Sequence, residues 1–209
     1  MKKIILSLLS AGLIVNSSNA QIAIAPELGV NLANMSITNT TTSMKAGLAV
    51  GGVVDFGFTK NLYLQPGLFY LMNGCSFTGG SMSVNTIEIP VNVEYKLGDE
   101  GSNRFFFGAG PYLGYNVGGT IKNGGQSASL KIGSAKADLN SSGDDIKALD
   151  LGIGVNIGYL LANGFYVRAH YQAGLTNLDP SGGSSSIKTS AIGITVGYYF
   201  GAKKAQGGK

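Results

Sequence analysis

The residue types that commonly do chemistry are few in this chain. Its 209 residues include one histidine, His170, and one cysteine, Cys75, and no tryptophan. A structural zinc site takes four ligands, mostly cysteine and histidine, and one histidine and one cysteine argue against such a site. A Ser-His-Asp relay would require His170 to lie within hydrogen-bonding distance of a carboxylate. The place of His170 relative to the acidic residues therefore decides whether catalysis is plausible.

The neighbours of His170 follow from the alternation of apolar and polar residues around a tight turn at 162–164. In an antiparallel hairpin the turn sets the register, and here it places Asn156 opposite His170. The next strand, at 188–200, offers mainly small residues on the facing side. We interpret His170 as a structural residue, and we expect no catalytic, cofactor-binding or metal site and no cofactor.

Alternation with a period of two residues runs through almost the whole chain after residue 21 and predicts β-strands. Between Leu149 and Leu161, for example, large apolar residues occupy every odd position, and glycine or polar residues occupy most even ones. No segment shows a comparable helical periodicity. The alternating runs predict eight strands, at about 22–34, 44–58, 61–73, 83–98, 104–118, 147–162, 164–177 and 188–200.

The connections between these strands alternate in length. Short turns are expected at 59–61, 98–103 and 162–164, and longer loops at 35–43, 74–82, 119–146 and 178–187. An even number of antiparallel strands with short turns at one end and long loops at the other is typical of outer-membrane barrels. We therefore predict an all-β fold, an eight-stranded antiparallel up-and-down transmembrane β-barrel over residues 21–200. Both termini would lie beside the short turns, on the periplasmic side.

The composition of the less apolar face decides which side of the strands meets lipid. That face carries glycine, alanine, amides and a few charges; only 12% of all residues are charged and 33 are glycine. The surface of a soluble barrel would carry roughly 25–35% charged residues. We therefore expect the apolar face to point outward into lipid and the small polar face to fill a narrow lumen.

Charges in a confined lumen must be paired, so we predict a structural polar network there. Alternation along the strands assigns the following residues to it: Glu27, Asp55, Glu88, Glu94, Lys96, Arg104, Asp150, Arg168 and His170, with Gln65 and Gln172 beside them.

The N-terminus predicts export. Lys2 and Lys3 precede an apolar run at 4–15, and small residues end at Ala20, which is the pattern of a signal peptide spanning residues 1–20 and cleaved after Ala20. The run is too short to span a bilayer, which takes roughly 20 residues. Removal of the two lysines lowers the formal net charge from +4 to +2. No basic patch remains to bind nucleic acid, and the polar tail 201–209 is expected in the periplasm.

Aromatic and proline residues add two further expectations. Aromatic rings near the short turns predict an interfacial girdle, formed by Phe56, Phe58, Tyr95, Phe105, Phe165, Tyr198 and Phe200. Candidates for a second girdle at the loop end are Tyr70, Tyr115 and Tyr171. Because proline cannot donate to a β-ladder, we predict bulges at the four strand prolines, Pro26, Pro66, Pro90 and Pro111. Cys75, at the start of a predicted outer loop, is interpreted as a bystander.

Five segments in order along the chain resemble one family. They are Leu28-Gly29-Val30-Asn31-Leu32-Ala33-Asn34, Ile87-Glu88-Ile89-Pro90-Val91, the segment from Phe107 to Gly114, the segment from Phe165 to Asn177, and Val196-Gly197-Tyr198-Tyr199-Phe200. Together they look like the PorT-type outer membrane beta-barrel proteins of Bacteroidetes, small barrels of the OmpX and OmpA kind. The resemblance implies an eight-stranded barrel in the outer membrane and carries no defined activity; PorT itself is associated with type IX secretion and gliding. One departure is the tail 201–209, which follows the terminal aromatic Phe200.

Three functions fit these features. The first is a structural or surface-interaction barrel that is not an enzyme. Its long loops, above all 119–146, would contact outer membrane lipid, lipopolysaccharide or a protein partner that the sequence does not identify. Such a barrel would be a monomer inserted by the barrel assembly machinery. A small pore or transporter is the alternative, and an outer membrane enzyme is the least favoured.

Overall fold

The computed structural model describes residues 22–133, 145–180 and 185–200. The predicted signal peptide 1–20 and the tail 201–209 lie outside the described residues, as does 134–144 within the longest loop. Within the described ranges, no helix is long and apolar enough to cross a membrane. The strands are β1 (Ile22–Ile37), β2 (Thr42–Gly57), β3 (Leu62–Phe77), β4 (Gly80–Leu97), β5 (Arg104–Asn123), β6 (Gln126–Ser129), β7 (Ile132–Gly133), β8 (Ile146–Lys147), β9 (Leu149–Leu160), β10 (Phe165–Gly174) and β11 (Ile187–Tyr198).

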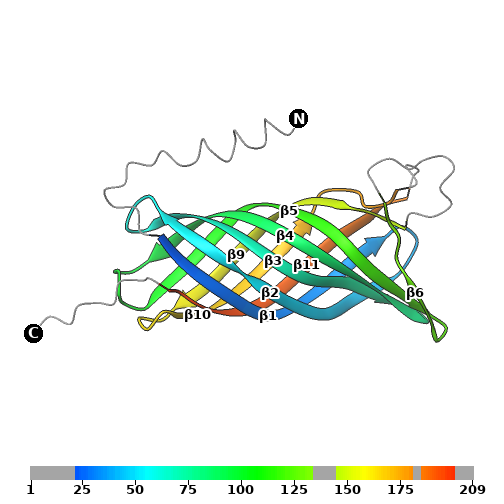
Figure 1. Ribbon diagram of the computed structural model, residues 1–209, viewed down its shortest axis with the longest axis horizontal. Coiled ribbons are helices and arrows are strands. Elements are labelled where there is room, and N and C mark those ends of the chain that lie inside the picture. The colour runs from blue at the N-terminus through cyan, green and yellow to red at the C-terminus, as the bar shows by residue number, and fades with distance from the viewer. Residues whose placement is uncertain (1–21, 134–144, 181–184, 201–209) are drawn as a thin grey trace, which may run out of the picture.

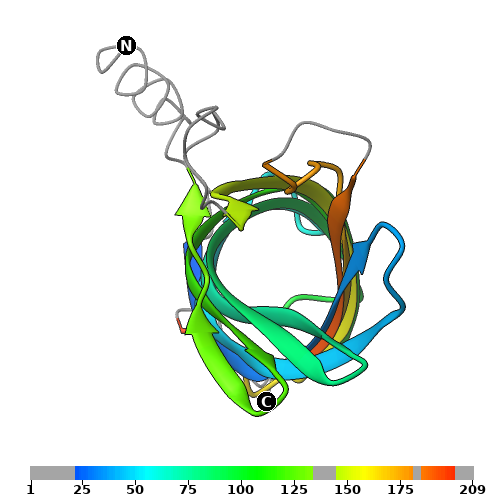
Figure 2. The ribbon, with the colours of Figure 1, turned by 90° about the vertical axis from the view of Figure 1, so that its right-hand side faces the viewer.

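Eight of these strands close into a barrel. They follow one another around the wall in the order β4, β3, β2, β1, β11, β10, β9 and β5, and the pairing of β5 with β4 completes the circle. Every pairing in this wall is antiparallel. Seen along its axis the barrel is a complete ring (Figure 2). The predicted eight-stranded up-and-down barrel is confirmed.

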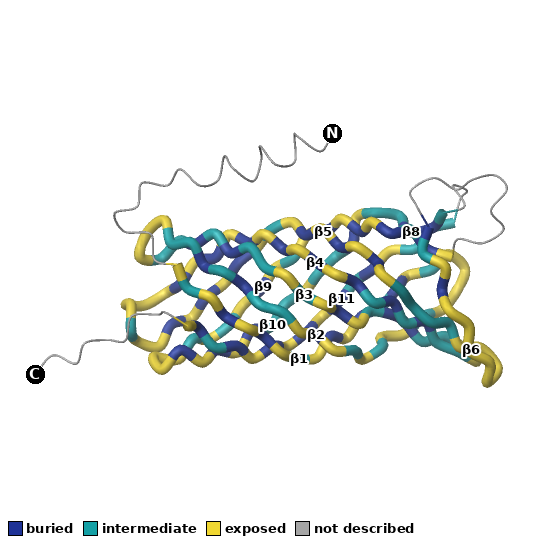
Figure 3. Tube along the Cα trace, viewed as in Figure 1, coloured by how far each residue is buried: buried dark blue, intermediate teal, exposed yellow. Residues whose placement is uncertain are grey.

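The apolar side of the barrel strands faces outward. Ile157 is 60% exposed and Ile194 is 59% exposed, whereas Gln65 and Glu94 are fully buried. Exposed residues alternate with less exposed or buried ones along barrel strands such as β4 and β9 (Figure 3). Because large apolar side chains on the outside are stable only against hydrocarbon, this inside-out pattern is that of a membrane barrel.

The short turns and both described chain ends lie at one end of the barrel (Figure 1). Ile24 near the start of β1 pairs with Phe200 at the end of the described chain. Aromatic side chains surround this end of the barrel. Their rings are in contact in the pairs Tyr95–Phe107, Phe105–Tyr159, Phe165–Tyr198 and Tyr198–Phe200. At the opposite end the predicted second-girdle residues Tyr70, Tyr115 and Tyr171 are exposed, as interfacial rings would be.

Strands occupy most of the described part of two predicted outer loops, 74–82 and 119–146. β3 and β4 continue through most of 74–82 and meet in a two-residue turn at Thr78 and Gly79, where Gly79 has a φ of 83°. β5 runs on to Asn123 and returns as β6 after Gly124 and Gly125, both with positive φ. A pair of glycines is a strong hairpin signal, and this signal was missed in the loop prediction.

The four strand prolines do not produce the predicted bulges. Pro66 pairs in register with Val91 of β4, while its pairing with β2 is interrupted without a change of register. The same holds for Pro26, Pro90 and Pro111, each paired on one side and interrupted on the other. A residue in an antiparallel strand directs its N–H toward one neighbour, so proline removes one bond and needs no extra residue. The register shifts lie elsewhere. The β2–β3 pairing shifts between Met44 and Ala49, and the β4–β5 pairing shifts between Asn85 and Thr86.

Candidate functional site

The lumen holds a buried ionic network centred on Arg168 of β10. Its Nη2 atom lies 3.3 Å from Glu94 Oε2 and 3.4 Å from Glu27 Oε1. Its Nη1 atom donates a hydrogen bond of 2.6 Å to Gln65 Oε1. These partners come from β4, β1 and β3, so one guanidinium ties four strands together across the interior.

Lys96 of β4 extends this network toward the short turns. Its ammonium forms ion pairs with Asp55 and, at 3.4 Å, with Glu94 Oε1. Gln65 Nε2 donates to Asp55 Oδ1 at 2.6 Å and to the Tyr199 hydroxyl at 3.0 Å. The amide of Gln65 therefore joins the lysine and arginine halves into one continuous set of contacts.

Arg104 closes the lumen at the turn end. Its Nη2 atom donates to the backbone carbonyls of Lys60 at 2.7 Å and Lys96 at 3.2 Å, and its Nη1 atom donates to the Tyr63 hydroxyl at 3.3 Å. Arg104 is buried, and it holds the turn between β2 and β3 against β4.

Aromatic rings fill the space between the lumen charges, and none of these rings was among the residues predicted for the network. Lys96 Nζ lies 4.3 Å from the ring centroid of Tyr199 and 4.5 Å from that of Tyr63. Arg168 Cζ lies 5.3 Å from the ring centroid of Phe106. Tyr166 donates a hydrogen bond of 2.6 Å to Glu27 Oε1. Alternation alone could have found Tyr166, because it shares an inward face with Arg168.

Further toward the loop end, two carboxyl groups have neutral neighbours. Gln172 Nε2 donates to Glu88 Oε1. The carboxyl group of Asp150 lies near the side chains of Tyr112 and Thr189, and its Oδ1 atom has no hydrogen-bond partner among the described residues. Both acids are buried, at 3% and 4% exposure. They are the two predicted lumen acids that the arginine and lysine contacts do not reach.

His170 lies where the hairpin register predicts. It pairs with Asn156 on β9 and with Gly193 on β11. Its ring packs over Gly193, where an added Cβ atom would lie 2.5 Å from His170 Cε1. The register therefore gives His170 no carboxylate or hydroxyl directly across on either side.

A cavity of about 40 Å³ lies within the lumen beside these groups. Its polar lining includes Glu88, Asn92, Asn156, His170 and Gln172. Gly110 of β5 and Gly154 of β9, which pair with each other, also line it. Side chains from β4, β9 and β10 surround the cavity, and the missing side chains of the glycines leave it open.

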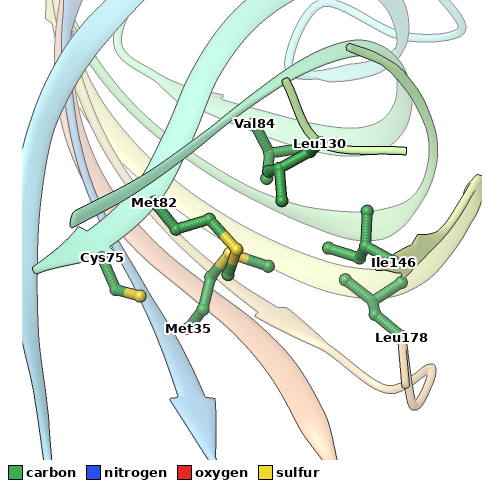
Figure 4. Close-up of a cluster of buried hydrophobic side chains, with 7 residues drawn as sticks. All are labelled: Met35, Cys75, Met82, Val84, Leu130, Ile146 and Leu178. Atoms are coloured by element: carbon green, nitrogen blue, oxygen red, sulfur yellow. The ribbon is translucent and has the colours of Figure 1, made fainter. Parts of the chain in front are cut away.

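An apolar cluster fills the outer end of the barrel (Figure 4). It joins strand residues to residues of the segments that follow β6 and β10, and its members are Met35, Cys75, Met82, Val84, Leu130, Ile146 and Leu178. Cys75 is fully buried within β3, which corrects its placement at the start of an exposed loop. It lies beyond Tyr70, the outer-girdle residue of the same strand, and burial raises the pKa of its thiol. The cluster lies inside the barrel at its loop end.

The match to known families agrees with this geometry. Residues 16–179 match the model of the outer membrane protein beta-barrel domain. The chain belongs to this family. A search of the curated proteins finds no match. The match supports an outer membrane barrel and does not distinguish the PorT-type group within it.

Several solved structures are similar in fold. Neisserial surface protein A has a TM-score of 0.50 and 12% identity, with 85% of this chain and 99% of that chain covered. OprG of Pseudomonas aeruginosa has a TM-score of 0.47 and 12% identity, with 88% and 97% covered. Ail, the attachment invasion locus protein of Yersinia pestis, has a TM-score of 0.46 and 11% identity, with 85% and 98% covered.

Proposed function

We propose that this barrel is an outer-membrane surface-interaction protein that presents a projecting β-sheet to a partner outside the cell. The observation that carries the proposal is the unequal length of the barrel wall. Pairing between β5 and β9 ends at Tyr115, whereas β5 remains paired with β4 as far as Asn123. These eight further residues extend the sheet by roughly 25 Å along the strand. The sheet therefore continues well past the outer aromatic girdle.

The projecting sheet ends in an edge strand. Within the described residues β6 pairs only with β5, and all four of its residues, Gln126–Ser129, are exposed. Leu130 N donates a hydrogen bond to Gly119 O. This bond shows which residues of β6 direct their N–H and C=O groups toward β5, because the direction alternates along the strand. By that alternation the N–H and C=O groups of Ser127 and Ser129 point away from β5. Such an edge can accept an extended strand from another protein.

The filled lumen supports a binding role over conduction. Arg168, Lys96 and their carboxylate partners cross the interior, and the apolar cluster covers its outer end. Eight strands leave room only for side chains in any case. The binding surface could contact outer membrane lipid, lipopolysaccharide or a protein. The resemblance to PorT-type barrels adds the secretion apparatus to the partners worth testing. We propose no enzymatic activity, because the register places Asn156 and Gly193 opposite His170.

Cysteine labelling of intact cells tests the orientation. A membrane-impermeant maleimide should react with Gln126→Cys at once, and with Lys60→Cys only after the outer membrane is opened. The native Cys75 is buried and should stay unlabelled in the parent protein, which makes it the control. Labelling of Lys60→Cys on intact cells would reverse the assigned orientation.

A photo-crosslinking residue at position 126 tests the edge itself. We expect an adduct in living cells that is lost on Ser127→Pro, which removes a donor from the free edge, and kept on Ser127→Ala. An adduct that survives Ser127→Pro, or no adduct at all, would contradict the edge as the binding surface. Sustained single-channel steps in planar bilayers would instead support the pore.

A further inference from the structure

The charged residues of the eight wall strands separate into two groups. Eight of them are buried in the lumen: Glu27, Asp55, Glu88, Glu94, Lys96, Arg104, Asp150 and Arg168. The others are three lysines, Lys45, Lys122 and Lys188. All three lysines lie beyond the rows that contain the outer-girdle tyrosines, whereas every acid of these strands lies on the turn side of those rows. Past the outer girdle, the wall strands therefore carry positive charge only.

Two rows of small polar side chains cover the outward face of the projecting sheet. Cys75 and Met82 pair directly and lie in the apolar cluster inside the barrel. Neighbouring residues along a strand point to opposite faces, so Ser76, Ser81 and Ser83 point outward. Directly paired residues share a face, which extends both rows across the sheet. One row contains Ser43, Ser76, Ser81, Lys122 and Ser127, and the other contains Ser83, Thr120 and Ser129.

The ammonium group of Lys45 lies on this outward face. Its Nζ atom donates to Ser83 Oγ at 2.5 Å and to Ser81 Oγ at 3.2 Å, although Lys45 is on β2 and the serines are on β4. On β3, between them, Gly74 pairs with Ser83 and has no side chain. Ser81 also pairs directly with Lys122 of β5. Because the Cβ atoms of such a pair are about 4.5–5.5 Å apart, both lysines lie beside one serine.

These two lysines have charge and donors left for a ligand. An ammonium group has three donors, and the two hydroxyl groups that accept from Lys45 are neutral. Neither Lys45 nor Lys122 forms an ion pair with another described residue, since the ion pairs of the described chain lie in the lumen. Lysine binds phosphate as a point charge, and hydroxyl groups can donate to phosphate oxygens. The chemistry of this face therefore fits a phosphate group.

The height of the face relative to the girdle indicates where that phosphate comes from. Ile87 of β4 pairs with Tyr70 on one side and with Tyr115 on the other, which marks the outer girdle in this part of the wall. Interfacial tyrosines lie at the level of the lipid headgroups. Ser83 is four residues further out, which is roughly 13 Å along the strand and roughly 10 Å in height at a strand tilt of about 40°. Lysine side chains can extend back toward the interface over such distances.

We propose that this outward face binds the phosphate groups of an outer-leaflet lipid headgroup. Lys45 and Lys122 supply the positive charge, and the hydroxyl groups of Ser81, Ser83 and Thr120 supply neutral donors beside them. The inference rests on the orientation in the proposed function, with the loop end outside. It does not rest on the β6 edge, because a lipid would contact the face of the sheet.

Binding of diphosphoryl lipid A to the full barrel in a nonionic detergent tests the proposal, with native mass spectrometry as the readout. The parent protein should bind lipid A more tightly than the same lipid without its two phosphates. Lys122→Gln should weaken binding about fivefold, the effect of one lysine near an anionic surface. Lys60→Gln, which removes an exposed lysine at the turn end, should leave it unchanged. Equal binding by the two variants, or equal binding of the two lipids, would overturn the proposal.

Lys45 also connects β2 to β4, so its variants require a check of folding by gel mobility. Lys45→Arg keeps the charge and should keep both the folded mobility and lipid binding. Lys45→Gln combined with Lys122→Gln should weaken binding by about 25-fold if the two contributions add. Lys122 is exposed, so Lys122→Gln alone decides the matter if the double variant does not fold.

Inorganic phosphate distinguishes a lipid from a free ion. Lipid A should stay bound when inorganic phosphate is added at the same concentration. Its displacement would show that the face binds free phosphate and would overturn the lipid assignment. The crosslink at position 126 is a separate readout: an adduct there, together with lipid binding that Lys122→Gln does not change, would support the β6 edge and contradict the lipid site.

Discussion

Replacement of Arg168 by methionine is the most direct test of the lumen network. Methionine keeps the unbranched apolar stem of the side chain but is shorter, and it removes the charge and five donors. Arg168 is 4% exposed and lies within 3.4 Å of two carboxylates, on Glu27 and Glu94. Its loss would leave both carboxylates buried with less counter-charge, and Gln65 Oε1 without its donor.

The expected loss of stability follows from this burial. Breaking a buried ion pair by removing one partner costs about 3–5 kcal/mol. Since about 1.4 kcal/mol corresponds to a tenfold change, the unfolding equilibrium should shift by between roughly two and four orders of magnitude. The free energy of unfolding, measured by urea titration in lipid vesicles and followed by gel mobility, gives this value. Lys188→Met, at an exposed position, should change it by less than about 0.5 kcal/mol.

A triple variant distinguishes electrostatics from packing. Glu27→Gln and Glu94→Gln combined with Arg168→Met remove the charges together, and a neutral replacement of a buried ionic group often costs little. We expect the triple variant to recover most of the stability lost in Arg168→Met. A single variant within about 1 kcal/mol of the parent, or a triple variant no better than the single, would refute the reasoning.

Two further predictions concern the wall of the barrel. Ile194→Arg places a charge on the lipid face near the middle of the apolar band and should cost about 2–4 kcal/mol of unfolding free energy, whereas Ser127→Arg on the projecting sheet should cost almost nothing. Gly110→Ala would put a carbon 2.0 Å from Val91 O, so it should prevent the shift in gel mobility that marks a folded barrel, while Gly118→Ala should fold normally.

The wall of the barrel could be predicted from local patterns. Alternation assigns each residue to one face, and the turn at 162–164 sets the register that places Asn156 opposite His170. Both are properties of neighbouring residues along the chain, and the period of two holds in any β-strand. The prolines were misjudged because the sequence does not show which neighbouring strand receives a given N–H. In the barrel, Pro66 keeps its pairing with β4 and only its pairing with β2 is interrupted.

The contents of the lumen depended on the closed structure. Alternation indicated that Arg168 points inward, but its partners on β1, β3 and β4 come from strands that closure and strand tilt bring opposite it. The same closure brings residues of β4, β9 and β10, among them Glu88, Asn156 and Arg168, around one cavity. Residue types along one strand determine which face is polar. Which charges meet across the interior depends on the stagger between strands distant in sequence, and no local pattern encodes that stagger.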